Sequence, residues 1–370
     1  MKILAFLNAY TSGKSGGDMC FIEIFKRIKP KNIIVMTSSL GRRLCQSEDL
    51  KADFIVTTRE KAFKNIYLTY FLRIIRAGIH ALLIRNFDII YATSDSLPDI
   101  IPAVFLKIRY PKKVFVSKIF HHIPSSRFLS FFFQQVSLFF IKLFADVVIV
   151  DSNILKKQLI TNGFLRSKLH VIYPGITIRN RNKSEKKYDG VFMSRLHKSK
   201  GIDDILQIWE KVKNVLPEAK LAIIGHGSKN MYTKLKKQIN KLKLKKNIDL
   251  LGFLPDEKAF SIINSTKVFL FPSHEEGFGM IVGEVLSCDV PIISYNLPVF
   301  GETFKPAIHT APCFDINSFS KKTIEILNNV GKQKSSIENK ELLKLFSWDI
   351  SCKKELSVIK YNLNSDKTNL

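Results

Sequence analysis

The stretch that decides the fold reads PSHEEGFGMIVGE and occupies residues 272–284. The apolar run before it, residues 268–271, is typical of a buried strand, and residues 279–286 have the pattern of a helix. The order is therefore strand, glycine-bearing turn and helix N-terminus. Such an N-terminus presents unpaired backbone N–H groups and a partial positive charge, so it can hold an anion.

Two carboxylates, Glu276 and Glu284, lie eight positions apart in this stretch, and two glycines flank Phe278 between them. Glutamates beside a helix N-terminus can accept hydrogen bonds from sugar hydroxyls. This is the chemistry that a nucleotide-sugar site needs. The alternative is a buried turn followed by a helix with two surface carboxylates.

The stretch resembles the donor-sugar motif of family 4 glycosyltransferases (glycosyl transferases group 1), which are retaining enzymes of the GT-B fold. In that family two glutamates are separated by seven residues, and Gly-Phe-Gly follows the first. The resemblance implies that Glu276 and the backbone after it hold the donor sugar, and that Glu284 holds the ribose hydroxyls. The donor-binding residues implied here are Glu276, Gly277, Phe278, Gly279, Met280, Ile281 and Glu284.

A basic segment, SRLHKSKG at residues 194–201, follows another strand-like run. Arg195 and Lys200 can bind a diphosphate through charge-assisted hydrogen bonds, which stabilise a leaving group as its negative charge develops. The segment resembles the family's Arg-Leu…Lys-Gly motif; an ordinary basic loop is the alternative.

Gly225 ends the next strand, where glycine allows close approach to a ligand. In the family, the turn equivalent to Phe253 and Leu254 contacts the nucleotide base.

A glycine loop, residues 12–18, follows the first predicted strand. It is not a Walker A motif, because Asn8 stands where that motif needs a glycine five positions before Gly13. The loop resembles the glycine pair of GT-B transferases, which implies that Gly16 and Gly17 approach the donor phosphate or the acceptor. A surface turn is the alternative.

A histidine pair, His121 and His122, follows a further strand-like run. In the family a histidine at this point faces the donor sugar, and an imidazole can hydrogen-bond a sugar hydroxyl. Alignment with the family's usual His-Asp favours His121, but the second histidine leaves the choice open. A structural role is the alternative.

Composition limits the other classes of site. The sequence contains no DxD motif, so we expect metal-independent chemistry, with Arg195 and Lys200 acting electrostatically in place of a metal. Five scattered cysteines without CxxC spacing argue against a disulfide framework or a zinc site and suit a reducing compartment.

At 370 residues the chain suits two domains rather than one core. Short apolar runs alternate with helical stretches, which predicts doubly wound, Rossmann-like α/β sheets. We predict an acceptor-side domain at 1–178, a linker at 179–187, a nucleotide-sugar-binding domain at 188–345 and a terminal segment at 346–370. The resemblance implies that the two domains face each other across a cleft and that the terminal segment is a helix crossing back to the first. Strands are expected at 2–7, 32–36, 54–56, 89–91, 113–117, 147–150, 190–193, 219–224, 248–251, 268–271 and 291–294.

The net charge is +26, and residues 1–180 carry +16 of it. This implies anionic partners, unless the lysines are only a solvated surface. We exclude nucleic acid, because no recognised binding motif and no stacking platform of interleaved aromatics occurs.

Two apolar segments bear on a membrane. Residues 128–150 are rich in Phe, but polar interruptions favour a buried or half-buried helix over a span. Residues 66–87 predict a helix with a narrow basic stripe beside an apolar face, which suits docking on anionic lipid. A core helix with snorkelling arginines is the alternative. The predicted stripe consists of Thr69, Arg73, Arg76 and His80.

Together these features predict a cytoplasmic, metal-independent hexosyltransferase (EC 2.4), peripheral on the inner face of the membrane. It would move a sugar from a nucleoside-diphosphate sugar to a glycan or lipid-linked acceptor in cell-envelope assembly. A non-catalytic nucleotide-sugar-binding protein and an epimerase of the same fold are the alternatives. The predicted catalytic residues are His121, His122, Arg195, Lys200 and Glu276.

Overall fold

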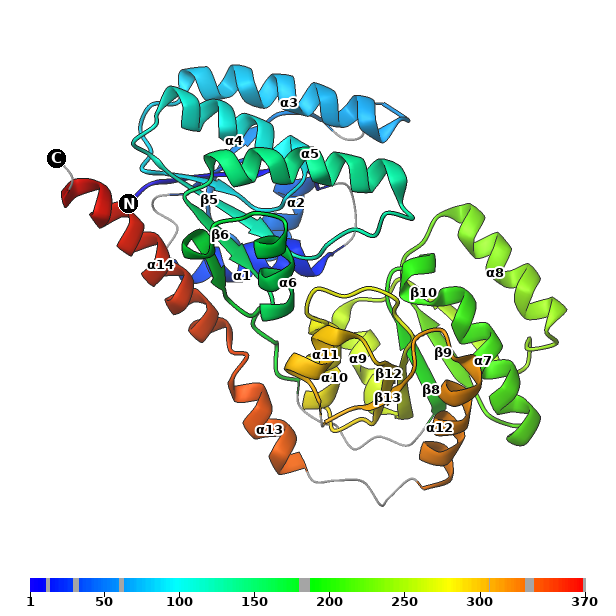
Figure 1. The fold of residues 1–370 in the computed structure, drawn as a ribbon. Helices are drawn as coiled ribbons and strands as arrows, with labels where there is room; N and C mark the ends of the chain where they lie inside the picture. Colours follow the sequence, from blue (N-terminus) through cyan, green and yellow to red (C-terminus); the bar gives the residue numbers. More distant parts are fainter. Residues whose placement is uncertain are drawn as a thin grey trace. The chain divides into compact units, whose positions relative to one another are not determined.

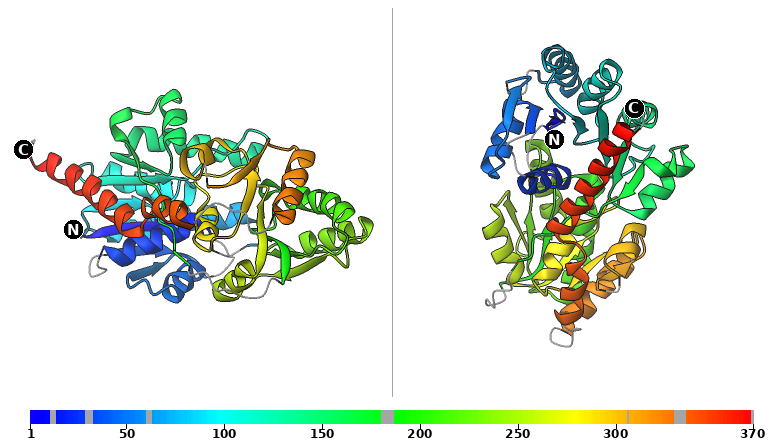
Figure 2. Two further views of the ribbon diagram at one scale, coloured as in Figure 1. Left: turned by 90° about the horizontal axis from the view of Figure 1, so that it is seen from below. Right: turned by 90° about the vertical axis from the view of Figure 1, so that its left-hand side faces the viewer.

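The computed structural model describes residues 1–10, 14–28, 33–59, 63–179, 187–305, 307–329 and 336–368, the side chains of 336–338 and 365–368 excepted. The chain divides into two units: Met1–Gly175 with Phe346–Leu370, and Ile176–Leu345. Each unit is an open parallel sheet covered by helices (Figure 1, Figure 2), which confirms the predicted pair of Rossmann-like folds. Residues 180–186 of the predicted linker lie outside the described part.

The sheet of the first unit has the strand order β3-β2-β1-β4-β5-β6-β7, and all neighbours are parallel. Ile3 pairs with Ile33 on one side and with Ile89 on the other. The central strands are buried along their whole length, as a sheet covered on both faces requires. The elements are β1 (Ile3–Leu7), α1 (Gly16–Arg27), β2 (Ile33–Thr37), α2 (Ser39–Ser47), β3 (Asp53–Val56), α3 (Ile66–Leu83), β4 (Ile89–Ala92), α4 (Leu97–Arg109), β5 (Val114–Ile119), α5 (Phe128–Phe144), β6 (Val147–Val150), α6 (Asn153–Thr161), η2 (Arg166–Lys168), β7 (Leu169–Val171) and α14 (Trp348–Thr368).

The sheet of the second unit has the order β10-β9-β8-β11-β12-β13, again with parallel neighbours. Trp209 is fully buried and fills the space beside Gly190, where a Cβ would come within 2.7 Å of the indole. The elements are β8 (Tyr188–Met193), η3 (Lys198–Lys200), α7 (Ile202–Val215), β9 (Leu221–Ile224), α8 (Lys229–Lys241), β10 (Ile248–Gly252), α9 (Asp256–Asn264), β11 (Thr266–Phe271), α10 (Met280–Ser287), β12 (Ile292–Tyr295), α11 (Pro298–Thr303), β13 (His309–Ala311), α12 (Ile316–Asn328) and α13 (Ser336–Lys344).

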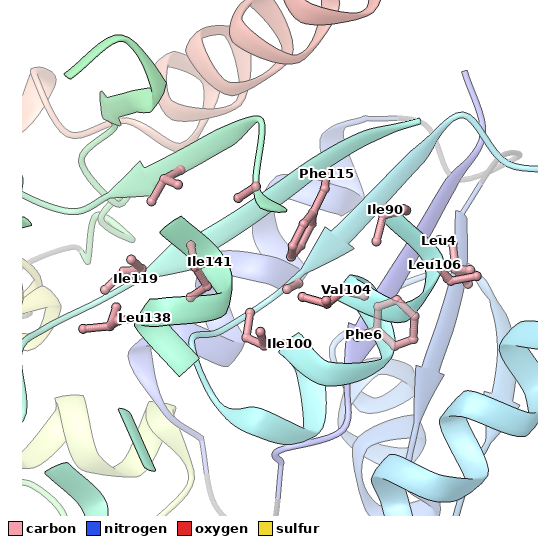
Figure 3. Packing of buried hydrophobic residues seen from close by; sticks show 14 of the residues in the cluster. Leu4, Phe6, Ile90, Ile100, Val104, Leu106, Phe115, Ile119, Leu138 and Ile141 are labelled. Atoms are coloured by element: carbon pink, nitrogen blue, oxygen red, sulfur yellow. The ribbon is translucent and has the colours of Figure 1, made fainter. Parts of the chain in front are cut away.

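Helices α3, α4 and α5 cover one face of the first sheet. Figure 3 shows strand residues such as Ile90 and Phe115 beside helix residues such as Val104 and Ile141, all of them buried in one apolar cluster. Burial of these side chains is the main force that holds the helical layer to the sheet.

Helices α1 and α14 pack on the opposite face, as predicted for the terminal helix. Tyr91 of β4 points to this face and packs against Phe21 and Phe25 of α1. Its hydroxyl donates to Oε1 of Glu355 on α14 (2.5 Å), and Nζ of Lys118 lies 3.1 Å from Oε2 of the same carboxylate. The last helix of the chain is therefore anchored to the first unit by a buried ion pair.

Two strands, β7 and β13, were not predicted, and both are edge strands of three residues. Such short segments show too little periodicity to be recognised from sequence. As a result β6 is the second-last strand of its sheet and β7 forms the edge.

Candidate active site

In the second unit β8 and β11 are neighbours in the middle of the sheet. The strands after β8 continue to one edge (β9, β10), and the strands after β11 continue to the other (β12, β13). The carboxyl ends of β8 and β11 therefore border the crevice where open α/β sheets bind ligands. Arg195 and Lys200 follow β8, and Glu276 follows β11. Two motifs far apart in sequence thus meet at one topological switch point.

Lys200 and Glu276 form a largely shielded ion pair at this point. The ammonium of Lys200 donates to Oε1 of Glu276 (2.7 Å) and to the carbonyl of Glu275 (3.1 Å), and the hydroxyl of Ser273 donates to the same Oε1 (2.8 Å). The two side chains are 14% and 12% exposed, so water screens their attraction less than it would at the surface. From the sequence we predicted that Lys200 contacts the diphosphate and Glu276 the donor sugar, whereas in the structure the two side chains contact each other.

Gly201 explains why the two segments can approach so closely. Its φ is +70°, and a Cβ there would stand 1.8 Å from the carbonyl oxygen of Pro272. Only glycine meets both conditions without strain. The backbone N–H of His274 then donates to the carbonyl of Ser199 (2.9 Å) and ties the segments together.

The N-terminus of α10 supplies the backbone donors expected from the sequence. Gly279, with φ of +90°, turns the chain into the helix, and no side chain caps it. Phe278 is buried and its ring packs against Phe304 at 5.4 Å, so only its backbone is available to a ligand. Glu284 is half-buried in the second turn of the helix, whose first two residues are Met280 and Ile281.

The remaining predicted contacts follow the adjacent strands β8, β9 and β10 along the same sheet edge. Arg195 is exposed. The N–H of Gly225 donates to the carbonyl of Gly252 (2.8 Å), which brings the β9 and β10 turns together. Phe253, next to Leu254, is 59% exposed and offers an apolar ring at the surface.

The sequence did not predict a chain of polar hydrogen bonds next to the Glu276 segment. It joins Asp204, His274 and Tyr295. Asp204 of α7 accepts hydrogen bonds from Nε2 of His274 (2.9 Å) and from the hydroxyl of Tyr295 (2.7 Å). Burial acts to raise the pKa of Asp204, but these two hydrogen bonds outweigh it and hold the pKa below its ordinary value. A charged Asp204 thus fixes His274, two residues before Glu276. The sequence signals for this arrangement are a His close to the motif and an acid in the first turn of the helix after β8.

In the first unit the glycine loop leads directly into α1. Residues 11–13 lie outside the described part. Ser15 caps the helix and exchanges hydrogen bonds with Asp18, while Gly16 begins it. A Cβ on Gly17 would come within 2.8 Å of the Phe120 ring, so glycine is needed for this contact. Gly17 therefore packs beside the residue that precedes the histidine pair.

The histidine segment is held by Gln134, which is buried although it interrupts an apolar run in sequence. Its Nε2 donates to the carbonyl of His121 (2.8 Å) and to Asp95 (2.6 Å), and its Oε1 accepts from the N–H of Ile123 (2.8 Å). Burial raises the pKa of Asp95 against the opposing effects of Gln134 and His121. The ring of His122 stacks on Phe131 at 6.0 Å. Sequence reasoning missed Asp95 and Gln134; the position of Asp95 just after β4 is the signal that was available.

The loop after β1 is held by two buried ionisable residues of the first unit, Arg73 and Asp99. Nη1 of Arg73 donates to the carbonyls of Asn8 and Tyr10 (both 2.6 Å), and Asp99 accepts from the N–H groups of Asn8 (2.6 Å) and Ala9 (3.1 Å). Arg73 and Thr69 are both fully buried. The predicted basic stripe is therefore wrong for Thr69 and Arg73, because Arg73 bonds to backbone carbonyls inside the unit. The other two members of the stripe reach the surface, Arg76 exposed and His80 half-buried.

Among the described residues, no group of three or more His, Cys, Asp or Glu side chains is arranged to hold a metal ion.

Comparison with known proteins agrees with this geometry. Residues 176–342 match the family described as Glycosyl transferases group 1. The chain is 29% identical over 212 residues to an uncharacterized glycosyltransferase of Methanocaldococcus jannaschii (55% of this chain, 56% of that protein). It is 28% identical over 186 residues to the O-antigen biosynthesis glycosyltransferase WclY of Escherichia coli (47% and 49%). The chain thus spans about half the length of these curated relatives.

The fold of both units recurs in a solved structure. The crystal structure of Anabaena HepE in complex with UDP and glucose matches with a TM-score of 0.80 and 16% identity, covering 98% of this chain and 100% of that one. At this identity the likeness shows the fold. The second unit thus matches the Glycosyl transferases group 1 family over residues 176–342, and the chain as a whole has the GT-B fold.

Proposed function

We propose that the protein is a retaining glycosyltransferase that moves a hexose from a UDP-sugar to an acceptor hydroxyl. The observation that carries this proposal is the Lys200–Glu276 pair at the switch point of the family-matched unit. The Anabaena structure with UDP and glucose supports the choice of nucleotide.

In the proposed mechanism the acceptor hydroxyl attacks the anomeric carbon from the face that the leaving group occupies. The bond to the UDP oxygen breaks, and the departing diphosphate takes the proton of the acceptor. Arg195, Lys200 and the N-terminus of α10 stabilise the developing negative charge. Glu276 orients the sugar and Glu284 binds the ribose. The protein supplies positioning and electrostatics more than acid–base groups.

The donor is tested by thermal unfolding with UDP-, GDP- and ADP-sugars. We expect UDP-sugars to raise the melting temperature by about 2–4 °C at a hundredfold excess over the dissociation constant. The double variant Glu284→Ala, Lys200→Ala should lose this shift. Lys198→Ala, an exposed lysine in the same segment, is the matched control and should keep it. If no nucleotide sugar shifts the wild type, the proposed donor site is wrong.

Transfer is tested by release of UDP and by product analysis. Glu276→Gln should lower the rate of transfer about 100-fold, because a charged group that orients the sugar is lost. Binding without transfer to any acceptor would identify a non-catalytic binding protein. Conversion of the free donor to its epimer would identify an epimerase.

We also propose that the acceptor is an intermediate of cell-envelope glycan or glycolipid assembly. The reaction would take place in the cytoplasm, where the enzyme would encounter nucleotide sugars. The name of the E. coli relative, an O-antigen biosynthesis enzyme, supports this class of acceptor. An acceptor screen with lipid-linked and free oligosaccharides would test it. Transfer to free oligosaccharides alone would contradict a lipid-linked acceptor.

A further inference from the structure

Helix α3 of the first unit carries an exposed apolar stripe, while its buried side consists of Thr69, Arg73, Ala77 and Ala81. Leu68, Phe71, Ile75, Ile79 and Leu82 recur at spacings of three and four, so they form one stripe along the helix. Each is between 43% and 63% exposed. A surface helix of a globular protein normally shows the reverse arrangement.

A second apolar stripe runs along α5. Leu129, Phe132, Phe139 and Leu143 also recur at helical spacing, and each is between 52% and 56% exposed. Between the two helices, α4 packs against both and adds Ile108, which is 62% exposed. Figure 1 and Figure 2 show the three helices side by side in one layer. We call the outward sides of α3, α4 and α5 the apolar face. Contiguous exposed apolar side chains on three neighbouring helices mark a site of interaction.

The charges around the apolar face have one sign. The three helices contain a single acidic residue, Asp99, and it is buried. Exposed cations stand at the helix ends, namely Lys64 and Arg85 beside α3, and Arg109 and Lys112 at the end of α4. A second copy of the chain seated symmetrically on this face would set cations against cations. An anionic surface with an apolar interior complements both features.

From this combination we propose that the apolar face docks the first unit onto a bilayer that contains anionic lipid. Leu and Phe side chains enter the acyl boundary, and the flanking cations meet the head groups. The inference rests on the first unit alone and does not depend on the identity of the donor.

The helix lies on the membrane and does not cross it. By length and composition α3 could span a bilayer, and only 22% of it is buried in the protein. However, its inward side provides Arg73, which bonds to Asn8, Tyr10 and Thr58. A spanning helix would have to break these bonds and carry the arginine into lipid.

Vesicle flotation tests the docking. We expect the protein to float with phosphatidylcholine vesicles containing about one-third phosphatidylglycerol and to bind pure phosphatidylcholine much more weakly. The face variant Leu68→Gln, Phe71→Gln, Phe132→Gln, Phe139→Gln should bind more than about tenfold more weakly. Its matched control substitutes four residues outside the face with similar exposure, 57–63%, and should bind like the wild type: Leu165→Gln, Ile178→Gln, Val215→Gln, Leu345→Gln.

Substitution of cations beside the apolar face and elsewhere distinguishes docking through this face from a general attraction of a basic protein to anionic lipid. Arg85→Gln, Arg109→Gln, Lys112→Gln should weaken binding to the anionic vesicles. The removal of three exposed cations from α8, in Lys236→Gln, Lys237→Gln, Lys241→Gln, should have little effect. Equal losses in both variants would overturn the proposed orientation.

Insertion is read from fluorescence. The native Trp209 and Trp348 are buried. Phe132→Trp should be quenched by brominated lipid, whereas Leu165→Trp should not. Both variants should keep donor binding, so that failure to dock is distinguished from failure of the donor site. Wild type that stays unbound to anionic vesicles, or a dimer in solution that the face variant converts to monomer, would overturn the proposal.

Discussion

Two buried ionisable residues, Arg73 and Asp99, determine how the first unit holds the loop after β1. One supplies donors to backbone carbonyls and the other accepts from backbone N–H groups. Unpaired backbone groups at a buried loop are costly, so the two side chains replace the partners that water would provide. Both come from helices that look apolar in sequence, which is why their role was not predicted.

Asp99 should make stability depend on pH. Burial raises its pKa to about 7, against the hydrogen bonds from Ser94 and the loop. Because the unfolded carboxyl ionises near pH 4, the unfolded state loses its proton first, and stability falls between about pH 4 and pH 7. Asp99→Asn removes this effect.

Urea unfolding of the wild type and Asp99→Asn between pH 4 and pH 8 checks this. The free energy of unfolding of the variant, relative to the wild type, should rise by up to about 4 kcal/mol over this range. Asp151, whose pKa burial also raises to about 7, affects both proteins alike and cancels in the comparison. A difference that does not change with pH would contradict the prediction.

At the scale of the element, α14 is attached through the buried pair Lys118–Glu355, whose side chains are 4% and 0% exposed. Burial acts to lower the pKa of Lys118, but the charge of Glu355 outweighs it and raises the pKa. Removal of one partner leaves the other charge buried without compensation. The attachment of the helix therefore depends on both residues together.

Glu355→Gln should destabilise the protein by about 3 kcal/mol, since Lys118 loses its counter-charge while Tyr91 keeps a partner. The triple variant Tyr91→Phe, Lys118→Met, Glu355→Met should recover much of this loss, because it removes both charges together with the hydroxyl that donates to Glu355 and so leaves no polar group of this contact unpaired. Denaturant unfolding of the wild type and the two variants gives the comparison. A triple variant less stable than Glu355→Gln would show that the charges themselves stabilise the helix.

Helix and strand positions were predictable where the apolar pattern was long. The central strands and the helix after Gly279 appear within a few residues of their predicted places. The edge strands β7 and β13 were missed because a segment of three residues is too short to show an alternation of apolar and polar side chains. Helix α3 was located correctly, but the burial of Arg73 and Thr69 was not predicted, since the pattern shows an apolar and a polar side without saying which one faces the sheet.

At the scale of the whole molecule, the two units should respond separately to changes placed in each. The predicted donor residues Lys200, Glu276 and Glu284 belong to Ile176–Leu345, whereas Lys118 and Glu355 belong to the other unit. In scanning calorimetry we expect UDP to raise the transition of the second unit, because a ligand stabilises the state that binds it. Glu355→Gln should lower the transition of the first. A single transition that moves as a whole in both experiments would show that the units unfold together.

The sequence by itself determined the two Rossmann-like sheets, the resemblance of the second unit to a known family and the segments of its candidate site. These depend on local patterns: apolar runs, turn glycines and the spacing of Glu276 and Glu284. Only the tertiary structure decided that Lys200 pairs with Glu276, that Gln134 and Asp95 hold the histidine segment, and that α3 turns Arg73 inward. Those contacts join residues distant in sequence, and whether a polar group is paired inside or solvated outside depends on which partners the fold places beside it.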